Sequence, residues 1–230
     1  MKHRASFASI VAFAVPFATV ILYGCGGERW TVVHNDAPHR SVIVFGDSLA
    51  AGVGASTPDH GFAALMFLQL SNGDASSQFD DLAISGSTVA DVLDKQVPDA
   101  EARGMAATDV WLCVGGNDVF QGTSTDAYST TEHSLVARIR SSWPQAHIIV
   151  FGVPDVTRTP LLPGVAQFHD VASADNAAAA DAARQSQADF VDLFSFSDGQ
   201  NVAGQLSSDS LHPDDAGHAA IAAYAENKLR

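Results

Sequence analysis

Short apolar runs recur along the chain and alternate with longer segments in which apolar residues repeat at helical spacing. The runs are rich in Val, Ile and Phe, as expected for strands that are buried on both faces. Strands that alternate with helices predict a parallel sheet with helices on both faces, which is an α/β fold in three layers. The five predicted strands are residues 41–45, 79–84, 109–114, 147–151 and 190–194.

One predicted helix has an especially clear start. Apolar residues follow Val89 at helical spacing as far as Val97, and Thr88 with Asp91 has the spacing of a capping box. Before the last helix, Pro213 is predicted to occupy the first helical position. Helical patterns also cover residues 62–69, 135–143, 165–187 and 221–229. In a parallel sheet, active groups are expected in the loops beyond the carboxyl ends of the strands.

The N-terminal segment differs in pattern from the remainder of the chain. Positive charges at Lys2 and Arg4 precede an apolar run over residues 5–23, which predicts an export signal over residues 1–24. Leu22, Gly24 and Cys25 resemble a bacterial lipobox, in which the cysteine is lipidated and becomes the new N-terminus. The alternatives are a plain secretory signal and an uncleaved signal anchor, because the apolar run is about long enough to span a bilayer if it is tilted.

This pattern divides the chain into three parts. After the signal, residues 25–40 are rich in polar residues, Gly and Pro and predict a tether, and residues 41–230 form the predicted domain. We therefore expect an exported protein of the bacterial cell envelope, attached to a membrane by a lipid at Cys25. It would face the periplasm or lie on the cell surface.

Composition and charge narrow the function classes. The chain is 47% hydrophobic and 17% charged, as globular proteins are, and its formal net charge is -14. Lys and Arg form no cluster beyond the first four residues, so nucleic-acid binding is not expected. Cys113 lies inside a predicted strand, where a lone cysteine is more often a small hydrophobic residue than a nucleophile. The histidines show no metal-ligand spacing, and no metal or cofactor is expected.

Four loops carry groups that could do chemistry, although each has an ordinary structural interpretation. Ser48 follows the first strand and could be a nucleophile or a helix N-cap. Gly86 and Asn117 follow the second and third strands, where they could stabilise an oxyanion or simply form turns. His212 precedes the last helix with Asp209 three residues before it, and could be a general base or a surface histidine.

Taken together, the loops favour a serine nucleophile. A serine, two oxyanion donors and an Asp/His pair fall at the ends of different strands, or just before the helix that closes the sheet. A phosphate-binding loop is disfavoured because Gly46, Gly52 and Gly54 match neither common spacing and no lysine lies near them. We therefore predict Ser48 as the nucleophile.

The chain resembles the SGNH/GDSL hydrolase superfamily. The four motifs that carry the resemblance are Gly46-Asp47-Ser48-Leu49, a second block centred on Gly86, Gly115-x-Asn117-Asp118, and Asp209-x-x-His212. The resemblance covers residues 41–230 and implies a flavodoxin-like three-layer α/β/α sandwich. One position departs from the common pattern: Asp81 stands five residues before Gly86, where relatives often have asparagine.

The resemblance also implies a role for each site residue. Ser48 would attack the ester carbonyl, His212 would act as general base and then general acid, and Asp209 would orient the imidazole. The N–H groups of Ser48 and Gly86 and the side-chain amide of Asn117 would form the oxyanion hole.

The substrate is expected to be a small ester with a short- to medium-chain acyl group. Two alternatives remain open: a carbohydrate O-acetylesterase acting on envelope polysaccharide, and a surface lipoprotein that binds a ligand without catalysis. The sequence favours no particular oligomeric state. Several apolar residues could line an acyl pocket or belong to the core: Phe120, Phe151, Val153, Leu161, Leu162 and Phe168.

Overall fold

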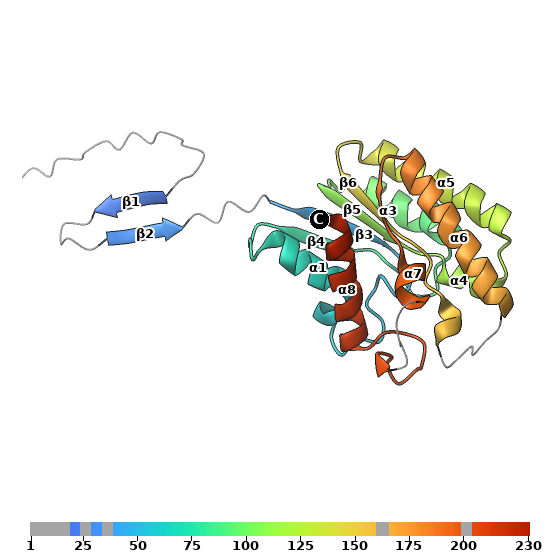
Figure 1. Cartoon of the computed structure of the whole chain (residues 1–230). Coiled ribbons are helices and arrows are strands. Elements are labelled where there is room, and N and C mark those ends of the chain that lie inside the picture. The colour runs from blue at the N-terminus through green and yellow to red at the C-terminus, as the bar shows by residue number, and fades with distance from the viewer. Residues whose placement is uncertain (1–18, 24–28, 34–38, 160–165, 199–203) are drawn as a thin grey trace, which may run out of the picture. The chain divides into compact units, whose positions relative to one another are not determined.

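The computed structural model divides into two units, residues 1–38 and 39–230 (Figure 1). The structure describes residues 19–23, 29–33, 39–159, 166–198 and 204–230. In the first unit, β1 (Thr19–Tyr23) pairs with β2 (Arg29–Val33) in a two-stranded antiparallel sheet. Cys25 lies outside the described residues, so the export signal, the tether and the lipid anchor remain predictions. Within the described ranges, no helix has both the length and the apolar character needed to cross a bilayer.

A five-stranded parallel sheet forms the centre of the second unit. Its strand order is β4-β3-β5-β6-β7, and every neighbouring pair is parallel. The three central strands are almost completely buried, because helices cover both faces of the sheet. The strands are β3 (Ser41–Gly46), β4 (Gln78–Asp81), β5 (Asp109–Cys113), β6 (His147–Phe151) and β7 (Asp189–Val191).

Alternating side chains of the strands supply two apolar layers. Val44 and Trp111 pack on one face with α1 (Phe62–Ser71) and α8 (Asp215–Leu229). On the other face lie α5 (Thr125–Ser142), α6 (Ala166–Gln185) and a helical segment made of α2 (Val89–Asp91), the π-helical turn η2 (Val92–Gln96) and α3 (Val97–Ala102). This arrangement confirms the predicted three-layer α/β/α fold (Figure 1).

Two predicted strands end earlier than their apolar patterns suggest. β4 ends at Asp81, but the N–H groups of Leu82 and Ile84 still donate to Val44 O and Gly46 O at 2.9 and 3.1 Å, so residues 82–84 run beside β3 as irregular backbone. β7 ends at Val191 because Asp192 Oδ1 accepts from the N–H of Ser195 at 3.0 Å and starts α7 (Leu193–Asp198). The predictions of strand at residues 82–84 and 192–194 were therefore wrong.

The helix starts are set by side-chain caps. The predicted capping box of Thr88 and Asp91 is present. The last helix begins at Asp215, because the Asp214 side chain accepts from the N–H of Gly217 at 2.9 Å and acts as the N-cap. Pro213 therefore lies before the helix, and the prediction that it occupies the first helical position was wrong.

Candidate active site

The end of β3 turns sharply into the loop that carries Ser48. Gly46 has φ +155°, and a Cβ atom at this position would lie only 2.1 Å from the carbonyl oxygen of Cys113 on the adjacent strand. The next residue, Asp47, donates its N–H to the same oxygen at 3.1 Å. Only glycine allows this close approach, which places Ser48 at the carboxyl edge of the sheet, where it lines a cavity.

The loop before α8 brings an acidic group and an imidazole together. Asp209 Oδ2 lies 2.6 Å from His212 Nδ1, and Asp209 Oδ1 accepts hydrogen bonds from the N–H groups of Leu211 and His212, both at 2.9 Å. Desolvation pushes the pKa of Asp209 upward, but the hydrogen bonds from the His212 side chain and these two N–H groups outweigh it. The pKa of Asp209 therefore lies well below its ordinary value, so this carboxyl is ionised near neutral pH.

The imidazole also reaches the serine. His212 Nε2 lies 2.7 Å from Ser48 Oγ, although the two residues are 164 positions apart in the chain. Since Asp209 holds Nδ1 in its protonated form, Nε2 is left as the acceptor for the serine proton. The structure thus brings together the three residues that were predicted as the catalytic group, in an order that allows proton transfer from Ser48 to His212.

The two other predicted oxyanion donors line the same cavity as Ser48. Gly86 has φ +88°, and Asn117 lies near the start of α4 (Gly116–Gln121). Asn117 Nδ2 donates to the carbonyl oxygen of Ser87 at 2.9 Å, which orients the amide and leaves its second hydrogen available. Among the described residues, the N–H groups of Ser48 and Gly86 have no hydrogen-bond acceptor.

Gln96 supports the serine loop, and sequence reasoning missed it. It lies in the π-helical turn η2 and is buried. Its Oε1 accepts from Gly46 N–H at 2.9 Å, and its Nε2 donates to Gly46 O at 2.8 Å and to Ser87 Oγ at 3.1 Å. One side chain thus connects the Ser48 loop with the Gly86 loop. The available signal was a polar residue four positions after Val92, on the buried face of the predicted helix.

Acidic groups lie buried beneath the site. Burial is the main reason that the pKa of Asp47 is raised to about 7, and the nearby charge of Asp118 adds to the effect. Asp118 Oδ2 accepts from the N–H of Val89 at 3.0 Å, which joins the Asn117 loop to α2.

Cys113 is buried beside these groups, and burial raises the pKa of its thiol well above the ordinary value. Its location confirms the interpretation of this cysteine as a small core residue.

The cavity at Ser48 has a volume of about 250 Å³. Of the residues weighed as acyl-pocket or core, Phe120 lines it, whereas Phe151 and Val153 are buried in the core. Phe168 packs against Phe120 with 6.5 Å between ring centroids. Leu161 and Leu162 lie outside the described residues. The larger apolar side chains of the lining are Leu49, Val114, Phe120, Val156, Leu193, Phe196, Leu206, Leu211 and Ile221.

A Ser–His–Asp arrangement at the carboxyl ends of a parallel sheet, beside potential oxyanion donors, is typical of α/β hydrolytic enzymes. The sequence profile of the GDSL-like lipase/acylhydrolase family matches residues 44–220. The chain therefore belongs to this family, within the SGNH/GDSL hydrolase superfamily, and is a hydrolase that acts on esters.

Solved structures show the same fold at low sequence identity. TesA is 22% identical with a TM-score of 0.67, and the match covers 83% of this chain and 98% of TesA. A phospholipase A1 from Streptomyces albidoflavus is 20% identical with a TM-score of 0.63, covering 83% and 100% of the two chains. An acetyl xylan esterase from Geobacillus stearothermophilus is 20% identical with a TM-score of 0.64, covering 83% and 94%. A search of curated protein sequences found no significant match.

Proposed function

We propose that the protein is a serine esterase that cleaves short- to medium-chain acyl esters through an acyl-enzyme intermediate. The observation that carries the proposal is the continuous hydrogen-bonded chain from Asp209 through His212 to Ser48 at a mainly apolar cavity. A positioned base next to a hydroxyl is what a serine needs to become a nucleophile at neutral pH.

The geometry supports a two-step reaction. As Ser48 Oγ attacks the ester carbonyl carbon, its proton passes to His212 Nε2, and the carbonyl oxygen becomes an oxyanion. The Ser48 and Gly86 N–H groups and the free hydrogen of Asn117 Nδ2 would stabilise that charge. His212 then returns the proton to the leaving alcohol. Water repeats the sequence on the acyl-enzyme and releases the acid, while Asp209 stabilises the imidazolium in both steps.

The cavity supports the choice of acyl group. An apolar lining stabilises a hydrocarbon chain by removing its surface from water, at about 0.8 kcal/mol for each buried methylene. A volume of about 250 Å³ lies below the range of about 300–1,000 Å³ typical of drug-sized ligands, which favours short to medium chains over long ones. Acetylated carbohydrate, the alternative substrate, would leave most of this apolar surface unused.

The test is a chain-length series on the full-length protein. Turnover of p-nitrophenyl acetate, butyrate, octanoate and palmitate is measured for wild type, Ser48→Ala and the control Ser134→Ala, which removes an exposed serine hydroxyl on α5. We expect a maximum above acetate, loss by roughly 10⁴-fold or more in Ser48→Ala, and wild-type rates in the control. Activity on acetate alone would favour a deacetylase. Ester hydrolysis that persists in Ser48→Ala would refute the serine mechanism.

We also propose that the protein is exported and attached to a membrane of the bacterial cell envelope by a lipid at Cys25. The support is the sequence pattern, in which an apolar run ends at Leu22, Gly24 and Cys25. Cells fed an alkyne-labelled fatty acid should incorporate the label into the wild-type chain and not into Cys25→Ala. Equal labelling of both chains would contradict the proposal.

A further inference from the structure

One wall of the cavity is built from two short elements that are far apart in the chain. The turn η3 (Val156–Arg158) follows β6, and α7 follows β7. They contribute Val156, Leu193 and Phe196 to the lining. A substrate chain that fills the cavity must therefore contact both elements, and its fit depends on how they are held relative to each other.

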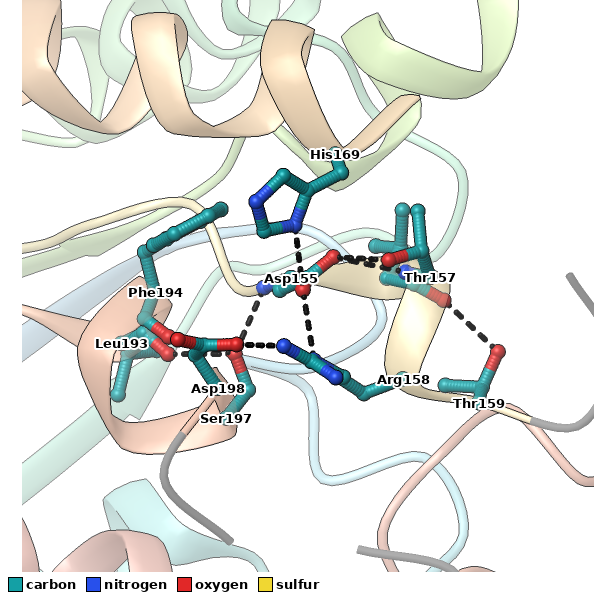
Figure 2. A network of polar contacts seen from close by, with 10 residues as sticks. Asp155, Thr157, Arg158, Thr159, His169, Leu193, Phe194, Ser197 and Asp198 are labelled. Carbon is teal, nitrogen blue, oxygen red and sulfur yellow. Dashed lines mark hydrogen bonds and ion pairs between the residues drawn. The ribbon is translucent and has the colours of Figure 1, made fainter. Parts of the chain in front are cut away.

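Asp155 connects these two elements (Figure 2). Its side chain is 0% exposed, and Oδ1 accepts from the N–H of Thr157 at 3.0 Å and from its hydroxyl at 2.6 Å. Oδ2 lies 3.0 Å from Arg158 Nε and 2.9 Å from His169 Nδ1. The N–H of Asp155 donates to Ser197 Oγ on α7 at 2.7 Å. The carboxylate and its own backbone thus hold η3, α6 and α7 together.

Arg158 extends this connection to the end of α7. Its Nε binds Asp155, while its NH2 group binds Asp198, so that one guanidinium joins two carboxylates (Figure 2). On the other side, the ring of His169 packs against Phe194 with 5.2 Å between ring centroids. Arg158 and His169 both donate to the buried carboxylate of Asp155. A carboxylate in the interior usually has such paired, hydrogen-bonding partners.

The charge state of Asp155 fits this role. Burial raises the pKa of this carboxyl, but the hydrogen bonds from Thr157 and His169 outweigh burial, so its pKa lies below the ordinary value. None of the hydrogen bonds in this network reaches Ser48, His212 or Asn117. The proposed reaction steps therefore do not use Asp155, and the network's visible contribution is to the shape of the cavity wall.

We infer that Asp155 is a positioning residue that sets acyl-chain selectivity by clamping η3 to α7. The inference rests on the proposed function of the cavity as an acyl site. Loss of the charge weakens the contacts with Arg158 and His169. The backbone bond from Asp155 N–H to Ser197 remains, but Arg158 loses the partner that aligns it with Asp198 on α7. The wall then becomes less rigid, and kcat/KM falls more for substrates that fill the cavity than for acetate, which contacts little of it.

The test compares Asp155→Asn with a matched control, Asp181→Asn. Asp181 also binds a histidine and an arginine, His133 and Arg184, but it lies on α6 away from the lining residues. For each chain, kcat and KM are measured on p-nitrophenyl octanoate and acetate with one preparation. We expect the octanoate-to-acetate ratio of kcat/KM to fall about tenfold in Asp155→Asn, mainly through KM, and to remain unchanged in Asp181→Asn.

The ratio separates positioning from general destabilisation, because the fraction of folded enzyme cancels between two substrates. An unchanged ratio in Asp155→Asn, with activity that still depends on Ser48, would overturn the clamp and leave the proposed function intact. Failure of the wild-type chain on every ester would instead refute the proposed function. If Asp155→Asn does not fold, Arg158→Gln at the half-exposed end of the network gives the deciding ratio. A shift in the same direction supports the clamp, and no shift overturns it.

Discussion

Glu132 should make the protein less stable as pH rises, and Glu132→Gln should remove this residue's contribution to the pH dependence of stability. Glu132 lies on the buried face of α5, one turn after Tyr128, and is 1% exposed. Among the described residues its Oε2 has no hydrogen-bond partner. Burial is the main reason that its pKa is raised from 4.5 to about 8, and the charge of Asp118 adds to this shift.

The direction of this pH effect follows from the number of protons that the native and unfolded states bind. Between the two pKa values the native state holds a proton on Glu132 that the unfolded chain has lost, so the free energy of unfolding falls as pH rises. A rise in the pKa of Glu132 from 4.5 to about 8 corresponds to a full effect on the order of 5 kcal/mol in the free energy of unfolding. Most of it, about 4 kcal/mol, should be lost between about pH 5 and about pH 9.

The assay is urea denaturation of wild type and Glu132→Gln, followed by circular dichroism at about pH 5, 7 and 9. The free energy of unfolding of Glu132→Gln minus that of wild type should rise by about 4 kcal/mol from about pH 5 to about pH 9. Glu101→Gln is the control, because the hydrogen bond from Arg138 lowers the pKa of Glu101 and this carboxyl is ionised in both states from about pH 5 upward. A difference between wild type and Glu132→Gln that stays constant with pH would refute the reasoning.

Three further predictions concern the site. Asp209→Asn should lower kcat on the preferred ester by roughly 10³–10⁴-fold with little change in folding. The reason is that the imidazole of His212 is no longer oriented by a carboxylate, and its protonated form is no longer stabilised by one. A loss below tenfold would contradict this. Asn117→Ala should lower kcat by roughly 10²–10³-fold with a smaller change in KM, and an effect on KM alone would argue against an oxyanion donor. Gly54→Ala should destabilise the fold by about 1–3 kcal/mol in thermal unfolding and impair activity, since its Cβ would lie 2.2 Å from Pro213 O at φ +99°. Gly73→Ala has a similarly positive φ of +76° with nothing within 4 Å, and should cost less.

Much of the fold could be predicted from local pattern, because apolar periodicity records which faces of an element are buried. The strands predicted at 41–45, 109–114 and 147–151 are confirmed to within one residue at each end. The ends of β4 and β7 were missed, since the residues that follow them are also apolar. At β7 the Asp192 side chain accepts from the N–H of Ser195 and starts a helix, through a hydrogen bond that an apolar count does not include. After β4, residues 82–84 keep two backbone hydrogen bonds to β3 without forming regular strand.

The sequence by itself determined the family and the order of the elements. It also identified the loops that carry the site: those with Ser48, Gly86, Asn117 and His212. These loops meet because parallel strands bring their carboxyl ends to one edge of a sheet. Only the tertiary structure decided which distant polar groups meet. Gln96 reaches Gly46 across 50 positions, and such a contact has no local signature. Asp155 meets Ser197 across 42 positions in the same way. A buried polar group is stabilised by partners that only folding brings within hydrogen-bond distance, so its role follows from three-dimensional contacts and not from spacing along the chain.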